Sequence, residues 1–397
     1  MSGLLAVSST TTARALAKLE ELAELLVEHR QSARRSVGRG LASNAGYAIL
    51  FAALFQAKAE ERFAEAAGRE LQDAAGFADV PSRGLFSGLA GLRAAAAYAE
   101  KLWPKFGRLA AQCDSYIGAE LSTIPEVVEM DTYDLISGWA GTRAALALEG
   151  GCNPDMYVES LLALFDSGEG RWRTRNRFFP DRASRNIIGV AHGVVGPLTI
   201  IALTTKPDPA TVARVVVHAR KVAELAITEN NAVGWPQWIG HNEIYRPMTT
   251  WCYGSAGIAA ALFAVGKWAR DEWLCEVAIS SLASIDHRSA AALPDAALCH
   301  GIMGTVACYA SVAANSSGHA FEVAIDDLVN LAIDRLAAEG NSITVRSNND
   351  SRLAFGELDG LAGVCLMLAT LLYDIDSSWM RLHGLLPLPH SSKSGCT

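Results

Sequence analysis

Apolar runs of helical length recur along the chain, and each follows a Gly-x-x-Gly pattern. The patterns are spaced about 50–60 residues apart, which indicates a repeat architecture. The leading glycines are Gly88, Gly138, Gly193, Gly254, Gly301 and Gly360, and a degenerate earlier copy is Ser43-Asn44-Ala45-Gly46. We therefore predict seven repeats.

The apolar runs differ in character from the segments between them. Each run is apolar nearly all round, as expected of a helix that is buried on every side. The segments at 211–227, 271–284 and 321–338 are amphipathic, which predicts outer helices with one face in water. We therefore predict an all-α protein, an α/α toroid built as a seven-fold double ring of inner and outer helices. An ordinary helical bundle with glycine turns is the alternative.

Three segments fall outside the repeat. The pattern at 12–30 predicts a long amphipathic helix outside the ring. An Arg-rich insertion at about 150–186 contains Arg173, Arg175 and Arg177, which are candidates for peptide binding, although most basic loops are simply solvated. The tail from about residue 384 is expected to be loose. We treat residues 1–397 as a single toroid domain.

Composition narrows the possible functions. Hydrophobic residues make up 50% of the chain and charged residues 19%, which is enough apolar material for a large core. The net charge of −8 argues against nucleic acid as the main partner. The chain has no run of about 18 uninterrupted apolar residues, the length needed to span a membrane. Eight cysteines in a long chain without a secretory signal favour a reduced, cytoplasmic protein.

Potential metal ligands lie just before two of the leading glycines. Cys252 and Cys299 each stand two residues ahead of their glycine, and His300 stands one ahead. Because equivalent positions of a closed ring meet at one end, we predict that these three residues bind one zinc ion. Three protein ligands and a vacant fourth position are typical of catalytic zinc. Each cysteine by itself would more simply be a core residue, so the shared register carries this prediction.

Further reactive residues share this end of the ring. His192 and Asp134 come from adjacent repeats, and a carboxylate beside an imidazole equips the histidine for acid–base chemistry. A core histidine and a helix-capping aspartate are the alternatives. Trp251 fits either the core or the lining of a substrate cavity. Glu357 and Asp359 could be helix-start charges.

Sulfur-rich zinc coordination favours one kind of chemistry over another. Zinc deprotonates a thiol that coordinates it, so a site with two cysteines suits the activation of a substrate thiol. Activation of a bound water is the alternative.

Four motifs of the chain point to a family: Tyr-Asp-Leu-Ile-Ser-Gly-Trp-Ala-Gly, Gly-Val-Ala-His-Gly-Val-Val-Gly, Trp-Cys-Tyr-Gly-Ser-Ala-Gly and Leu-Cys-His-Gly-Ile-Met-Gly. Together they resemble the lanthionine synthetase C-like family, over residues 41–375. The resemblance implies a seven-fold α/α toroid with a central zinc on the three ligands named above. It also implies that His192 and Asp134 are the acid–base pair and that Tyr253, beside the zinc cysteine, takes part in catalysis.

The resemblance implies a stand-alone cyclase that adds peptide cysteine thiols to dehydroalanine or dehydrobutyrine and so closes thioether rings. The expected partners are a dehydrated precursor peptide and the dehydratase and exporter of the same pathway. The expected place is the cytoplasm, with attachment to the membrane through that complex as an open alternative. In one departure, bacterial cyclases often carry an arginine where this chain has Met248. Arg246 is the candidate replacement and a candidate substrate-binding residue.

Two other functions remain open from the residues alone. One is a zinc enzyme that alkylates thiols, of the prenyltransferase or glutathione-adding kind. The other is a non-catalytic scaffold that binds zinc and thiols.

Overall fold

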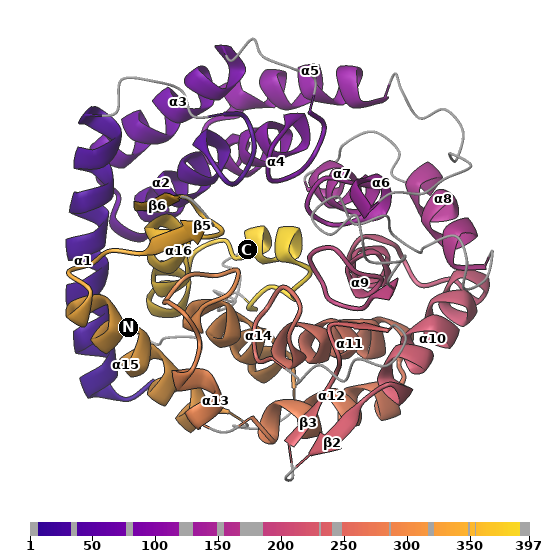
Figure 1. Ribbon diagram of the computed structural model, residues 1–397. Coiled ribbons are helices and arrows are strands. Elements are labelled where there is room, and N and C mark those ends of the chain that lie inside the picture. Colours follow the sequence, from indigo (N-terminus) through magenta and orange to yellow (C-terminus); the bar gives the residue numbers. More distant parts are fainter. Residues whose placement is uncertain are drawn as a thin grey trace, which may run out of the picture.

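The structure is a computed structural model that describes residues 7–32, 38–76, 82–118, 130–148, 155–166, 186–229, 232–239, 248–285, 287–316, 321–347, 350–353 and 355–389. In this part of the chain, seven inner helices alternate with seven outer helices (Figure 1). The inner helices are α2 (Asn44–Lys58), α4 (Leu89–Glu100), α7 (Trp139–Ala147), α9 (Val195–Thr204), α11 (Ser255–Ala269), α14 (Ile302–Asn315) and α16 (Leu361–Leu372). The outer helices are α1 (Ser9–Ser32), α3 (Glu61–Gly76), α5 (Gly107–Gly118), α8 (Asp155–Asp166), α10 (Pro209–Glu224), α12 (Glu272–Ala283) and α15 (Glu322–Ala338).

The inner helices form a closed ring. Each packs against the next along the chain, and α16 packs against α2, which joins the last repeat to the first. The helix α1 packs against α15 and α16, so the N-terminal helix supplies the outer partner of the last inner helix. The predicted seven-fold α/α toroid is therefore confirmed (Figure 1). None of the described helices combines the length and the apolar character needed to cross a bilayer.

The second glycine of each pattern lets a loop approach the start of the helix. In all seven repeats a Cβ atom at this position would lie 1.8–2.2 Å from a carbonyl oxygen of the preceding loop, a distance that no side chain tolerates. Gly46, in the degenerate first copy, behaves in the same way, with its added Cβ 2.0 Å from the carbonyl oxygen of Leu41. The second glycine therefore recurs because each of the seven repeats has the same close contact between a loop carbonyl and the start of the inner helix.

Short strands and helices complete the described chain. The antiparallel pairs are β1 (Asn186–Ile187) with β4 (Trp238–Ile239), β2 (Ile227–Glu229) with β3 (Ala232–Gly234), and β5 (Thr344–Ser347) with β6 (Asp350–Leu353). These strands are not predicted from the sequence, because two to four residues are too few to show an alternating pattern. The short helices are η1 (Pro104–Phe106), α6 (Met130–Tyr133), α13 (His287–Ala291) and η2 (Ser378–His383).

The structure corrects the predicted insertion at about 150–186. Its first part forms α8, which packs against α7 and α10 as the outer helix of its repeat. This stretch is therefore part of the ring and not an addition to it. The rest of the predicted insertion, 167–185, lies outside the described residues.

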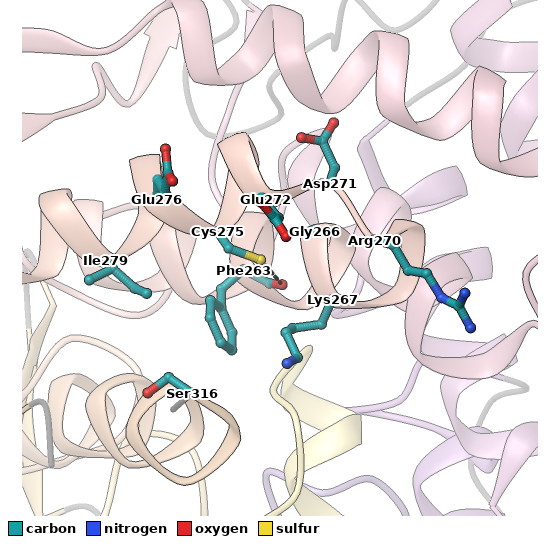
Figure 2. Close-up of a pocket in the computed structure, with 10 residues that line it drawn as sticks. All are labelled: Phe263, Gly266, Lys267, Arg270, Asp271, Glu272, Cys275, Glu276, Ile279 and Ser316. Carbon is teal, nitrogen blue, oxygen red and sulfur yellow. Dashed lines mark hydrogen bonds between the residues drawn. The ribbon is translucent and has the colours of Figure 1, made fainter. Parts of the chain in front are cut away.

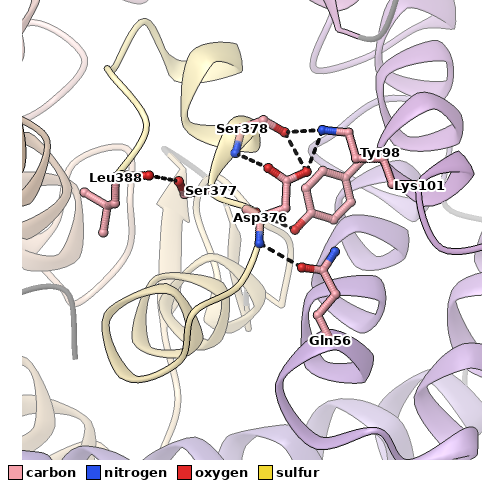
Figure 3. Close-up of polar contacts among 7 residues, drawn as sticks. All are labelled: Gln56, Tyr98, Lys101, Asp376, Ser377, Ser378 and Leu388. Atoms are coloured by element: carbon pink, nitrogen blue, oxygen red, sulfur yellow. Dashed lines mark hydrogen bonds and ion pairs between the residues drawn. The ribbon is translucent and has the colours of Figure 1, made fainter. Parts of the chain in front are cut away.

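The predicted loose tail from about 384 is also corrected. Leu385 and Leu388 are buried, and Figure 1 shows this yellow segment inside the ring. The segment is tied down by Asp376, whose backbone and carboxylate contact Gln56 of α2, Tyr98 of α4 and Lys101, which directly follows α4 (Figure 3). Leu385 and Leu388 thus belong to the apolar core inside the ring. Residues 390–397 lie outside the described residues.

Candidate active site and metal centre

The loops that precede the inner helices are joined by backbone hydrogen bonds around one end of the ring. The N–H of Ala191 donates to the carbonyl of Cys252 at 3.1 Å, and the N–H of Cys252 donates to the carbonyl of Cys299 at 3.4 Å. The next loop continues the series, with the N–H of Cys299 donating to the carbonyl of Leu358 at 2.9 Å. Since these residues all stand two places before a leading glycine, the repeats are equivalent in space as well as in sequence.

This register brings three potential metal ligands together. The sulfur atoms of Cys252 and Cys299 and a ring nitrogen of His300 all lie within 4.8 Å of one another. Sγ of Cys299 is 3.8 Å from Nε2 of His300. Both cysteines are buried, whereas the side chain of His300 is 49% exposed, so the cluster is open on the histidine side. In the described part of the chain, Cys252, Cys299 and His300 form a cluster whose geometry could hold a metal ion.

The electrostatics of the cluster favour a cation. Burial by itself raises the pKa of Cys252, but hydrogen bonds from Cys299 and His300 outweigh it and hold this pKa well below its usual value. The pKa of Cys299 is raised, first by the neighbouring Cys252 sulfur and then by burial. Two adjacent thiolates repel each other unless positive charge lies between them. Two cysteines and an imidazole fit a zinc ion, which binds thiolate and neutral histidine in tetrahedral sites.

A histidine–aspartate pair lies in the neighbouring loops. Nδ1 of His192 is 2.5 Å from Oδ2 of Asp134. Asp134 is fully buried, and its other oxygen accepts hydrogen bonds from the backbone N–H groups of Ser137 and Gly138, at 2.7 and 2.8 Å. Asp134 thus holds its loop at the start of α7 and orients the imidazole. The side chain of His192 is 22% exposed, so the ring has one edge towards solvent.

Tyr253 connects this pair to the metal cluster. It follows Cys252 in sequence, and its ring lies nearly parallel to the ring of His192, with centroids 6.0 Å apart and an angle of 27°. Burial, followed by the negative charges of Cys252 and Cys299, raises the pKa of Tyr253 above its usual value. The phenol therefore keeps its proton at neutral pH and is available to donate a hydrogen bond.

Comparison with protein families identifies the relatives of this chain. The family described as lanthionine synthetase C-like protein matches residues 40–383. The chain belongs to the lanthionine synthetase C-like family. Among solved structures, nisin cyclase is similar, with a TM-score of 0.75 and 17% sequence identity over 92% of this chain and 96% of that chain. At 17% identity this similarity shows that this lanthionine synthetase C-like protein has the same fold as nisin cyclase. A comparison with curated protein sequences finds no match.

Of the remaining predicted site residues of this lanthionine synthetase C-like protein, the described part of the chain includes Trp251. Trp251 is 1% exposed, and its indole N–H donates to the carbonyl of His383 at 2.8 Å. The side chain is therefore packed in the core, and its role in substrate binding stays a prediction. Arg246 and the arginines 173, 175 and 177 lie outside the described residues.

Sequence reasoning missed a buried pair beneath the site. Glu357 and His383 are both buried, with Oε1 3.4 Å from Nε2, and neither Oε1, Oε2 nor Nε2 has a hydrogen-bond partner. Burial raises the pKa of Glu357 to about 8 and lowers that of His383 to about 4. No motif marks this pair, since His383 lies in the tail that was expected to be loose.

A cavity of about 540 Å³ lies at the other end of α11 (Figure 2). Its lining includes Lys267, Arg270, Cys275 and Glu276. Burial raises the pKa of Cys275 above its usual value, which makes this thiol a poor nucleophile at neutral pH. The metal cluster precedes the first turn of α11, so this cavity is separate from it.

Proposed function

We propose that this protein is a zinc-dependent lanthipeptide cyclase, which adds peptide cysteine thiols to dehydroalanine or dehydrobutyrine and forms (methyl)lanthionine rings. The observation that carries the proposal is the cluster of Cys252, Cys299 and His300 beside the His192–Asp134 pair, in a chain of the lanthionine synthetase C-like family. Nisin cyclase, which shares the fold, is named for a cyclase activity. A thiol nucleophile and a proton donor are the two groups that this addition needs.

The metal-binding role falls to Cys252, Cys299 and His300. A zinc ion held there would lower the pKa of a peptide thiol and keep it as a nucleophilic thiolate at neutral pH. The half-exposed side of His300 leaves room for the peptide to enter. The buried sides of the two cysteines keep water away from the sulfur atoms.

The proton-transfer role falls to His192. The peptide sulfur forms a bond to the β-carbon of the dehydro residue, the carbon–carbon π bond breaks, and its electron pair passes to the α-carbon and its carbonyl as an enolate. His192, held at Nδ1 by Asp134, delivers a proton from Nε2 to the α-carbon, and the proton released by the peptide thiol replaces it. The phenol of Tyr253 donates a hydrogen bond to the enolate oxygen, which carries the developing charge.

Peptide recognition and partners complete the proposal. The proposed contacts for the precursor peptide are four arginines, because cationic side chains attract an acidic leader. They are Arg173, Arg175, Arg177 and Arg246. The proposed partners are the dehydratase that prepares this peptide and the exporter that removes it. The proposed place is the cytoplasm, free or at the membrane through that complex.

Metal analysis joined to a ring-closure assay tests the proposal. The purified protein should contain about one zinc per chain, and Cys252→Ala should lose both the zinc and the consumption of peptide thiols from a dehydrated precursor. Cys275→Ala, which removes a thiol at the far end of α11, is the matched control and should keep both. Bound zinc without any loss of alkylatable peptide thiols would reject the cyclase and leave a thiol-binding scaffold. Alkylation by a prenyl donor or glutathione instead would favour the other zinc enzymes.

A further inference from the structure

Asp359 and His300 lie in neighbouring loops of the ring. Each directly precedes the N-cap glycine of its inner helix, α16 and α14 respectively. The hydrogen bond from the N–H of Cys299 to the carbonyl of Leu358 joins the two loops one residue earlier. The residues that follow these two, His300 and Asp359, are therefore set side by side at the open end.

The imidazole of His300 presents its two nitrogens to different groups. Nε2 lies 3.8 Å from Sγ of Cys299, on the side of the metal cluster. Nδ1, the other ring nitrogen, lies 3.6 Å from Oδ1 of Asp359. A histidine that binds a metal through one nitrogen carries its proton on the other. A carboxylate at that second nitrogen fixes the tautomer and the orientation of the ring.

We propose that Asp359 is a positioning residue for the metal ligand His300, an inference that rests on the zinc site proposed above. The negative charge of Asp359 favours a proton on Nδ1, which leaves Nε2 free to bind the metal. The contact of 3.6 Å is an ion-pair distance, longer than a hydrogen bond, so the carboxylate acts on the ring through its charge.

The same arrangement occurs a second time at this end of the ring. Asp134 contacts Nδ1 of His192 from the adjacent loop, as Asp359 contacts Nδ1 of His300. In both pairs the carboxylate takes one nitrogen and leaves Nε2 for chemistry. The ring thus uses neighbouring repeats twice, once to orient the acid–base histidine and once to orient the ligand.

A simple helix-start charge is the competing explanation for Asp359. A carboxylate near the first turn stabilises a helix through its dipole, and exposed ion pairs contribute little to stability. The N-cap of α16 is Gly360, which has no side-chain cap, and the carboxylate of Asp359 lies 3.6 Å from Nδ1 of His300 and also interacts with the thiol of Cys299. A helix-start charge would affect the free energy of unfolding and leave the zinc affinity unchanged, so the two explanations predict different measurements.

Zinc affinity of the full-length chain, measured by competition with a chromophoric chelator, tests the inference. Asp359→Asn should bind zinc about 10- to 100-fold more weakly than wild type, the usual cost of losing a carboxylate behind a ligating histidine. Asp359→Glu should restore most of the affinity, because it restores the negative charge. Glu276→Gln, which removes one negative charge from an exposed position at the far end of the ring, is the control and should bind as wild type does.

A spectroscopic signature accompanies the affinity. In the cobalt-substituted protein, Asp359→Asn should alter the visible absorption bands that report tetrahedral geometry, whereas Asp359→Glu and Glu276→Gln should not. Wild-type affinity in Asp359→Asn, or an equal loss in Glu276→Gln, would overturn the positioning role. A wild-type chain that binds no zinc would reject the zinc site itself, so the two failures are distinct.

Discussion

At the scale of single residues, Asp134 shows that two functions can share one side chain. One oxygen accepts two backbone hydrogen bonds at the start of α7, and the other holds the imidazole of His192. A helix-capping aspartate and a catalytic aspartate were the alternatives from the sequence; the structure shows the capping contacts and the contact with His192, and the catalytic role stays a prediction. A rigidly held carboxylate orients a partner better than a mobile one, because its own position is already fixed.

The role of His192 leads to a prediction about activity. His192→Asn should lower the rate of ring closure about 10²- to 10⁴-fold, since a positioned acid–base group contributes that much, while the zinc content stays at the wild-type level. Single-turnover consumption of peptide thiols, with zinc measured on the same samples, checks this. His218→Asn changes another histidine that contacts an aspartate, Asp166 on the outer ring, and should be neutral. Normal ring closure in His192→Asn would show that the proton comes from another group.

At the scale of elements, the loop before each inner helix and the second glycine of that helix form one packing unit. The carbonyl of the loop sits where a Cβ atom would be. This contact fixes the position of each loop relative to its helix. Neighbouring loops are then joined by backbone hydrogen bonds in which Cys252 and Cys299 take part. The glycines therefore act on the metal site indirectly, by placing the backbone from which the ligands project.

Two glycine substitutions should have opposite effects on stability. In Gly363→Ala the new Cβ would lie 1.8 Å from the carbonyl oxygen of Glu357, and relief of such a clash costs about 1–3 kcal/mol. In Gly68→Ala, within α3, the nearest atom is in Phe106 at 3.9 Å, so the helix should gain up to about 1 kcal/mol. Urea denaturation of the metal-free proteins measures both. A neutral Gly363→Ala would mean that the loop moves away without cost.

At the scale of the whole molecule, segments from the two ends of the described chain complete the toroid. The helix α1 covers α16 on the outside, and the segment with η2 fills the centre. The second of these brings His383 against Glu357, with the aromatic rings of Phe86, Trp251 and Trp379 around the imidazole. A carboxyl and an imidazole in such apolar surroundings both prefer to be neutral.

The pKa values of this buried pair give a pH dependence of stability. Between pH 4.5 and about 8 the unfolded chain releases the Glu357 proton while the folded chain retains it. The free energy of unfolding therefore falls by about 1.4 kcal/mol for each unit that the pH rises through this range. For His383 the unfolded chain binds a proton between pH 6.5 and about 4 that the folded chain does not, so stability also falls as the pH drops through that range.

Glu357→Gln should remove the first of these two effects. The variant should gain stability relative to wild type as the pH rises from 5 to 7.5, by about 1.4 kcal/mol per unit. Urea denaturation of the metal-free proteins at several pH values measures the gain, and the exposed Glu276→Gln serves as the control. A constant difference between Glu357→Gln and wild type across this range would show that Glu357 is already ionised in the folded protein.

The sequence alone determined the helical class, the number of repeats and the three residues that cluster as potential metal ligands, because each depends on a local pattern that recurs. Buried helices need apolar residues throughout, close contacts need glycine, and equivalent repeats put Cys252 and Cys299 in equivalent places. The tertiary structure decided the rest. Only packing could show that Trp251 points inward and that α8 belongs to the ring. Only packing could bring His383 to Glu357 and Asp359 to His300. These contacts join residues from different repeats. Their distances depend on how the ring closes, and no local sequence pattern predicts that.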